Sequence, residues 1–325
     1  MTGFKIITSQ EALPERPLFI VGFGLPGTGK TTLSFTMPGP CLHLDFDKGI
    51  SRAEQKIRPN TVAIDKYADF RYWFHSEKFE AYIQNMGVKT VIADTVGTML
   101  EDYMIPWLIQ QNPKNSAGGS LSLSGWGALG AEFNLFKARL QSLGIHVFCV
   151  CHGKEQGDDG RQMRLAVKGG SNDILYRTAD LIGYVFMKSG ERWISFNPSE
   201  FNIGKNTAKL PPLQIPNSKE LEYDSFMAEQ VVTVCLEQMK EQSEAQVEFN
   251  KQMETWKAAL EESTKLKDFD QIIEDMKKEE SDLVKAQVKK LLGDKLKEKG
   301  FFYNRESGKV EVDKKKEEEA EKSEA

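Results

Sequence analysis

The stretch G-L-P-G-T-G-K-T at Gly24–Thr31 constrains this chain more than any other feature. It matches the full P-loop pattern G-x-x-x-x-G-K-[ST]. An apolar run that predicts a buried strand, Leu18–Phe23, precedes it, and a segment that predicts a helix, Thr31–Met37, follows. Glycines let the backbone curl until its N–H groups converge on phosphate oxygens, and the positive end of the following helix faces the same anion. The pattern therefore predicts a nucleotide site.

The loop itself supplies the predicted nucleotide contacts. Lys30 can reach the β- and γ-phosphates of ATP, and the hydroxyl of Thr31 can hold Mg²⁺. ATP and Mg²⁺ are therefore the expected cofactors. The residues expected to bind the nucleotide are Gly24, Leu25, Pro26, Gly27, Thr28, Gly29, Lys30, Thr31 and Thr32.

Residues 1–215 alternate strand-like and helix-like segments. Such alternation predicts an α/β fold with a mostly parallel central sheet and helices on both faces. Two further apolar runs flank K-S-G-E at Lys188–Glu191 and predict a β-hairpin. The expected strands are Leu18–Phe23, Cys41–Phe46, Thr61–Ile64, Thr90–Ala93 and Ile145–Cys151, and the expected helices are Phe70–Met86, Val96–Gln111 and Trp126–Leu143.

The composition changes from Ser218 onward, where Glu, Lys, Gln, Met and Leu dominate. Apolar residues recur there at helical spacing, which predicts a charged helical hairpin or small bundle. The segment after Gly300 could form a short hairpin, and the Lys- and Glu-rich end is expected to be frayed or disordered. We therefore expect an ATPase domain at 1–216, a helical region at 217–300, and a short segment with a charged tail at 301–325.

Bulk properties exclude little but point to the cytoplasm. The formal net charge of −5 argues against a chain coated in positive charge, though not against a local nucleic-acid groove. No apolar run approaches the roughly 20 residues of a membrane helix, so no membrane contact is expected. The four cysteines match no metal-ligand spacing and suit a reducing cytoplasm: Cys41, Cys149, Cys151 and Cys235.

Acidic residues end two of the predicted strands. T-V-I-A-D ends at Asp94, where a carboxylate can orient water on Mg²⁺; alternatively it caps the next helix. L-H-L-D-F-D ends at Asp47, which could polarise the attacking water. Asp45 lies two residues earlier, shares a face with Asp47 in an extended strand, and stays the alternative base. Both could instead be solvated or capping acids.

A histidine and two glycine-rich loops complete the candidates. His152 ends the strand V-F-C-V-C-H, where it could contact the γ-phosphate or simply bond to backbone. The loops Asn112–Gly125 and Gly153–Gly170 are expected to be flexible. Four cations in the second loop suit the backbone of single-stranded DNA, although a solvated hairpin would explain them too: Lys154, Arg161, Arg164 and Lys168.

Taken together, the order of these motifs resembles the RecA-type ATPase core, and especially the phage AAA-domain nucleotide-binding proteins, including RecA-core single-strand annealing and recombination proteins. The motifs G-L-P-G-T-G-K-T-T-L, L-D-F-D-K-G-I, V-I-A-D-T and V-C-H-G-K-E carry the resemblance, which covers roughly residues 17–215. It implies that Asp47 occupies the place of a catalytic glutamate and His152 that of a glutamine coupling nucleotide state to DNA. In G-K-N-T, it implies that Lys205 reaches a neighbouring subunit's phosphates, with Thr207 in place of an arginine.

The function expected from these features is ATP-dependent binding of single-stranded DNA in recombination or replication, with rings or filaments of identical subunits. An ATPase that acts on a protein partner through the charged C-terminal helices, as a loader or assembly factor, is the first alternative. A nucleotide-binding scaffold with negligible turnover is the second. A small-molecule kinase lacks support because no arginine-rich lid segment is present.

Overall fold

The structure is a computed structural model that describes residues 6–52, 56–156 and 162–313. It divides into two compact units, one formed by residues 15–239 and the other by residues 1–14 together with 240–325. The larger unit carries the P-loop.

A ten-stranded sheet in the order β12-β10-β9-β1-β7-β4-β2-β3 forms the centre of the larger unit, with β11 beside β9 and β8 beside β7. The strands from β9 to β3 pair in parallel, whereas β8, β10, β11 and β12 pair antiparallel. This mixed, mostly parallel α/β sheet confirms the predicted P-loop fold class. The strands are β1 Phe19–Gly24, β2 Cys41–Asp45, β3 Asn60–Ala63, β4 Thr90–Asp94, β7 His146–Gln156, β8 Gln162–Leu165, β9 Leu181–Lys188, β10 Glu191–Ser195, β11 Lys205–Asn206 and β12 Leu213–Ile215.

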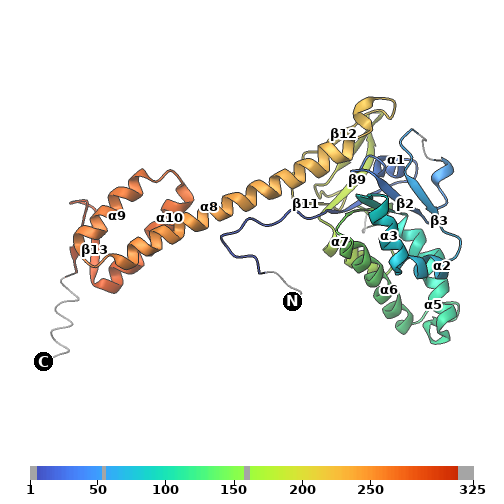
Figure 1. Cartoon of the computed structure of the whole chain (residues 1–325), viewed down its shortest axis with the longest axis horizontal. Helices are drawn as coiled ribbons and strands as arrows, with labels where there is room; N and C mark the ends of the chain where they lie inside the picture. The colour runs from blue at the N-terminus through green and yellow to red at the C-terminus, as the bar shows by residue number, and fades with distance from the viewer. Residues whose placement is uncertain (1–5, 53–55, 157–161, 314–325) are drawn as a thin grey trace. The chain divides into compact units, whose positions relative to one another are not determined.

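Side chains alternate between two hydrophobic cores, one on each face of the sheet. Val21 and Cys149 belong to the core covered by helices from α2 to α7, several of which lie together in Figure 1. Ile20 and Phe148 belong to the core on the opposite face, which is covered by α1 and by residues 223–235. The helical segments are α1 Lys30–Ser34, α2 Tyr67–Phe74, α3 Glu77–Asn85, α4 Val96–Thr98, η2 Met99–Met104, α5 Ile105–Gln111, α6 Leu123–Ser142 and α7 Ser171–Thr178.

Several predicted segments differ in detail. The helix expected over Phe70–Met86 is two helices, because the chain leaves α2 at His75 and Ser76 adopts an extended conformation before α3. The loop expected to be flexible, Asn112–Gly125, contains the turn η3 (Pro113–Asn115) and the two short paired strands β5 (Ser116–Ala117) and β6 (Ser120–Leu121). The hairpin expected around K-S-G-E is confirmed, with Lys188 paired to Glu191.

The larger unit continues past the boundary expected at residue 216. The turn η4 (Leu221–Tyr223), the segment η5 (Ala228–Thr233) and the start of α8 (Val234–Glu262) pack on the sheet. The N–H of Met227 donates to Thr36 Oγ1 at 3.1 Å. This stretch belongs to the larger unit because several of its side chains are buried in the core on this face of the sheet. They are Tyr223, Phe226, Met227, Val231, Val232 and Cys235.

The smaller unit has its own core. It contains the rest of α8, the helices α9 (Leu266–Lys278) and α10 (Asp282–Lys299), and a hairpin of β13 (Phe301–Asn304) with β14 (Lys309–Val312). The helical bundle and the hairpin were both predicted and are confirmed. The tail residues 314–325 lie outside the described residues. The side chains at the centre of the smaller unit are Leu260, Phe269, Ile272, Ile273, Leu292, Leu296 and Val310. Within the part of the chain that the structure describes, no helix is both long and apolar enough to cross a membrane.

Candidate nucleotide site

The P-loop lies between the end of β1 and the start of α1. Gly27 and Gly29 adopt φ angles of 81° and 79°, which glycine reaches without steric cost. The hydroxyl of Thr28 donates to the carbonyl of Leu25 at 2.9 Å and holds the turn closed. Helix α1 spans only Lys30–Ser34, shorter than the sequence predicts, so an anion bound here would be held mainly by the loop's own N–H groups.

A cavity of about 490 Å³ opens above the loop. This volume falls within the roughly 300–1,000 Å³ typical of small-molecule sites. Residues after β2, residues after β4 and two residues in the middle of β7 complete its wall, at the edge of the sheet where the parallel strands β1, β2 and β4 end. The lining residues are Pro26, Gly27, Gly29, Lys30, Thr31, Thr32, Asp47, Gly49, Arg52, Thr95, Val150 and His152.

Lys30 is the buried cation of this cavity. Its side chain is 5% exposed, and Nζ donates to the carbonyl of Leu25 at 2.7 Å. Burial lowers the pKa of Lys30, while the negative charges of Asp94 and Asp47 oppose that change. A buried ammonium bonded to a neutral carbonyl gains from exchanging that partner for a phosphate, because charge-assisted hydrogen bonds are stronger.

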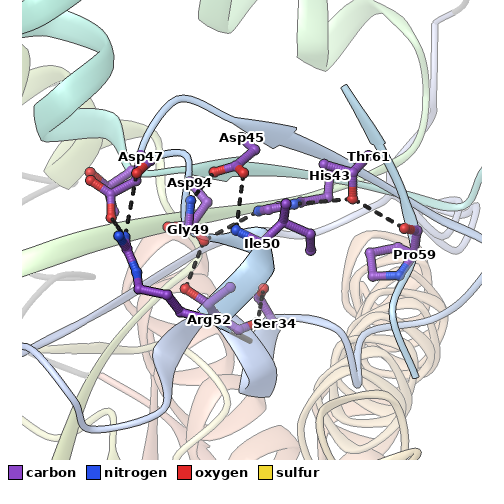
Figure 2. Close-up of polar contacts among 12 residues, drawn as sticks. Ser34, His43, Asp45, Asp47, Gly49, Ile50, Arg52, Pro59, Thr61 and Asp94 are labelled. Carbon is purple, nitrogen blue, oxygen red and sulfur yellow. Dashed lines mark hydrogen bonds and ion pairs between the residues drawn. The ribbon is translucent and has the colours of Figure 1, made fainter. Parts of the chain in front are cut away.

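Asp94 is 1% exposed and lies next to Thr31, which lines the cavity. Its Oδ2 accepts from Thr31 Oγ1 at 2.7 Å. The same oxygen lies 3.2 Å from His43 Nε2 (Figure 2). Its Oδ1 is buried and finds no hydrogen-bond partner among the described residues. A hydroxyl beside a carboxylate with an unused oxygen suits Mg²⁺, which prefers oxygen ligands and keeps several waters. Thr31 and Asp94 therefore fit the predicted metal.

His43 belongs to this site, although no sequence pattern assigned it a role. It is fully buried on β2, and Nδ1 lies 3.4 Å from Thr61 Oγ1, so its ring connects Thr61 to Asp94 (Figure 2). A signal for it existed in the sequence. A polar residue inside the apolar strand L-H-L-D must have a buried partner, because an unpaired polar group costs free energy there.

Asp45 and Asp47 play different parts. Asp45 is 1% exposed and accepts from the N–H groups of Gly49 and Ile50 at 2.9 and 3.1 Å, so it caps the turn η1 (Ile50–Arg52). Asp47 lines the cavity. Figure 2 shows it beside Arg52. Of these two acids, only Asp47 therefore lines the cavity.

Two residues that sequence reasoning missed hold Asp47. Arg52 donates to its Oδ2 at 3.1 Å, and Thr98 donates through Oγ1 to its Oδ1 at 3.1 Å. Thr98 lies fifty-one residues along the chain from Asp47, so no local pattern could have linked the two.

His152 lies beside the P-loop. Parallel pairing of β1 with β7 sets it opposite Gly24, and its side chain lines the cavity. Its Nδ1 is buried without a hydrogen-bond partner among the described residues. An imidazole nitrogen left unpaired at a phosphate cavity fits the predicted phosphate contact.

Strand β7 runs past His152 into a hairpin with β8, where the sequence predicted a flexible loop. Lys154 lies directly opposite Arg164 in that hairpin. Lys168 instead forms an ion pair with Glu101 at 2.8 Å, and Arg161 lies outside the described residues. Of the four predicted DNA-binding cations, the structure thus brings two together.

Lys205 lies outside the cavity lining, on β11. Its Nζ donates to the carbonyls of Tyr176 and Arg177 at 3.3 Å each, at the end of α7. A cation there also interacts favourably with the helix dipole. Its contact with a neighbouring subunit stays a prediction.

Comparison with known proteins places the cavity within a known domain family. A family model described as an AAA domain matches residues 16–208, which is more than half of the chain and includes every residue lining the cavity. No curated protein matches the chain.

Proposed function

The chain belongs to the AAA-domain family, and from this premise we propose that it hydrolyses ATP and couples hydrolysis to its grip on single-stranded DNA, in recombination or replication of the phage type. One observation carries the proposal. The strand that presents His152 to the phosphate cavity continues directly into the hairpin that pairs Lys154 with Arg164.

The residues divide the chemistry between them. Lys30 and the loop N–H groups would bind the β- and γ-phosphates. Thr31 and Asp94 would hold Mg²⁺, which would supply positive charge to neutralise those phosphates. Asp47 accepts a proton from the attacking water. Thr98 and Arg52 orient the Asp47 carboxylate, and their hydrogen bonds leave lone pairs free to take that proton.

The positive charges of the β7–β8 hairpin favour an anionic partner. Like charges directly opposite each other on antiparallel strands destabilise the pair, so Lys154 and Arg164 gain from an anion placed between them. The phosphates of single-stranded DNA meet this need at regular spacing. A change in the contact between His152 and the γ-phosphate would reach the hairpin through one continuous strand.

The test is ATP turnover measured with and without single-stranded DNA of defined length. We expect Mg²⁺-dependent turnover that rises with DNA, and none from Lys30→Ala, which removes the buried cation. Unstimulated turnover, with no DNA binding in any nucleotide state, would refute the DNA role. Proteins captured by residues 240–325 would then identify the partner of the alternative, a protein-directed ATPase.

Self-assembly is the remaining part of the proposal. If Lys205 reaches the phosphates of a neighbouring subunit, specific activity should rise with protein concentration, and ATP should promote rings or filaments. Turnover by a strictly monomeric, dilute protein at full rate would exclude this arrangement.

A further inference from the structure

An arginine packs against the P-loop, and the site described above gives it no role. Arg192 lies on β10, and its Nη1 is 2.6 Å from the position that a Cβ on Gly29 would take. The guanidinium therefore fills the space that glycine leaves open at the last turn before Lys30.

Arg192 is held in place from its other side. Its Nη2 donates to the carbonyl of Pro216 at 3.3 Å, and its guanidinium carbon lies 5.4 Å from the centre of the Tyr223 ring. Tyr223 is 2% exposed, so the ring is a fixed support. An arginine on an aromatic face keeps its remaining N–H groups oriented for an anion.

The polarity of the loop decides which part of the nucleotide Arg192 faces. Lys30 and Thr31, with Asp94 bonded to Thr31, mark the end of the cavity that would take the metal and the outer phosphates of the proposed ATP. The next residue, Thr32, places Oγ1 3.5 Å from the same Gly29 position that Arg192 crowds. A nucleotide whose terminal phosphates lie at Lys30 must extend the rest of its length away from them, past Thr32.

We propose that Arg192, supported by the Tyr223 ring, binds the α-phosphate of the bound nucleotide. This inference rests on the proposed ATP site and adds a contact that the P-loop motif does not contain. It also assigns a task to the β9–β10 hairpin and to the residues following 216, which place a cation and its support beside the loop.

The test compares Arg192→Ala with Lys188→Ala. Lys188 is a cation in the same hairpin but lies over Trp193, 5.7 Å from the ring centre, and serves as the matched control. Losing one charge-assisted phosphate contact should weaken ATP and ADP binding equally, by about 10- to 100-fold. Arg192→Lys should lose less because it keeps the charge. Thermal unfolding measured on each variant shows that the fold is retained.

Distinct outcomes would overturn the assignment. Weaker binding of ATP alone would place Arg192 at the terminal phosphate, and an unchanged affinity for inorganic triphosphate would place it at the nucleoside. Equal losses in Lys188→Ala would reduce the effect to general charge. If the wild type and Arg192→Ala bind ATP equally well, only this inference is refuted. If the wild type binds no nucleotide, the proposed function itself is refuted.

Discussion

Replacing each of the two acids at the end of β2 by asparagine should separate folding from catalysis. Asp45 is almost inaccessible to solvent and accepts hydrogen bonds from two backbone N–H groups. Asparagine at this position would turn its amide N–H₂ toward one of those donors. Losing one hydrogen bond to a charged acceptor should cost about 1.5–3 kcal/mol, or roughly 3–12 °C in Tm for a unit of this size. Turnover per folded molecule should persist in Asp45→Asn.

Asp47→Asn should show the opposite pattern. Its partner Arg52 is 69% exposed, so losing that ion pair should cost under about 1 kcal/mol. Loss of a general base should lower turnover by about 10²–10⁴-fold, while ATP affinity stays the same. Asp65→Asn, which removes an acid that is 87% exposed, is the control and should change neither quantity.

Steady-state turnover, ATP titration and thermal unfolding of the three variants decide the matter. A catalytic loss in Asp45→Asn with a stable fold, or normal turnover in Asp47→Asn, would refute the division of roles.

Three further results are expected. Burial raises the pKa of Cys41 from 9.0 to about 11, so wild type should lose up to ~3 kcal/mol of unfolding free energy relative to Cys41→Ala as pH rises from 9 to 11; parallel curves from denaturant titrations would contradict this. Replacing Lys154 and Arg164 by serine should flatten the log–log salt dependence of DNA binding by about 1.4, and an unchanged slope would place the DNA elsewhere. A chain cut to residues 15–239 should unfold cooperatively, whereas one ending at Pro216 should aggregate because it loses buried core residues; equal solubility would refute the boundary.

Local patterns were enough for much of the fold. The P-loop, the alternation of strands and helices, and the hairpin around K-S-G-E each depend on residues close in sequence, and each prediction is confirmed. The boundary expected at residue 216 falls short of the end of the larger unit, because it was inferred from local composition alone. A change in composition marks where helices become solvated, but it does not show that residues such as Met227 and Val231 still pack on the sheet.

The sequence by itself determined the fold class and the identity of the phosphate loop, because backbone turns and strand periodicity are local properties. Tertiary structure alone decided which acid faces the cavity, since Asp45 and Asp47 differ only in what surrounds them. It also joined His43 to Asp94, Thr98 to Asp47 and Arg192 to Gly29. Those contacts join positions 51 to 163 residues apart, and only the pairing order of the strands, together with the need to satisfy buried polar groups, brings them within hydrogen-bonding or packing distance.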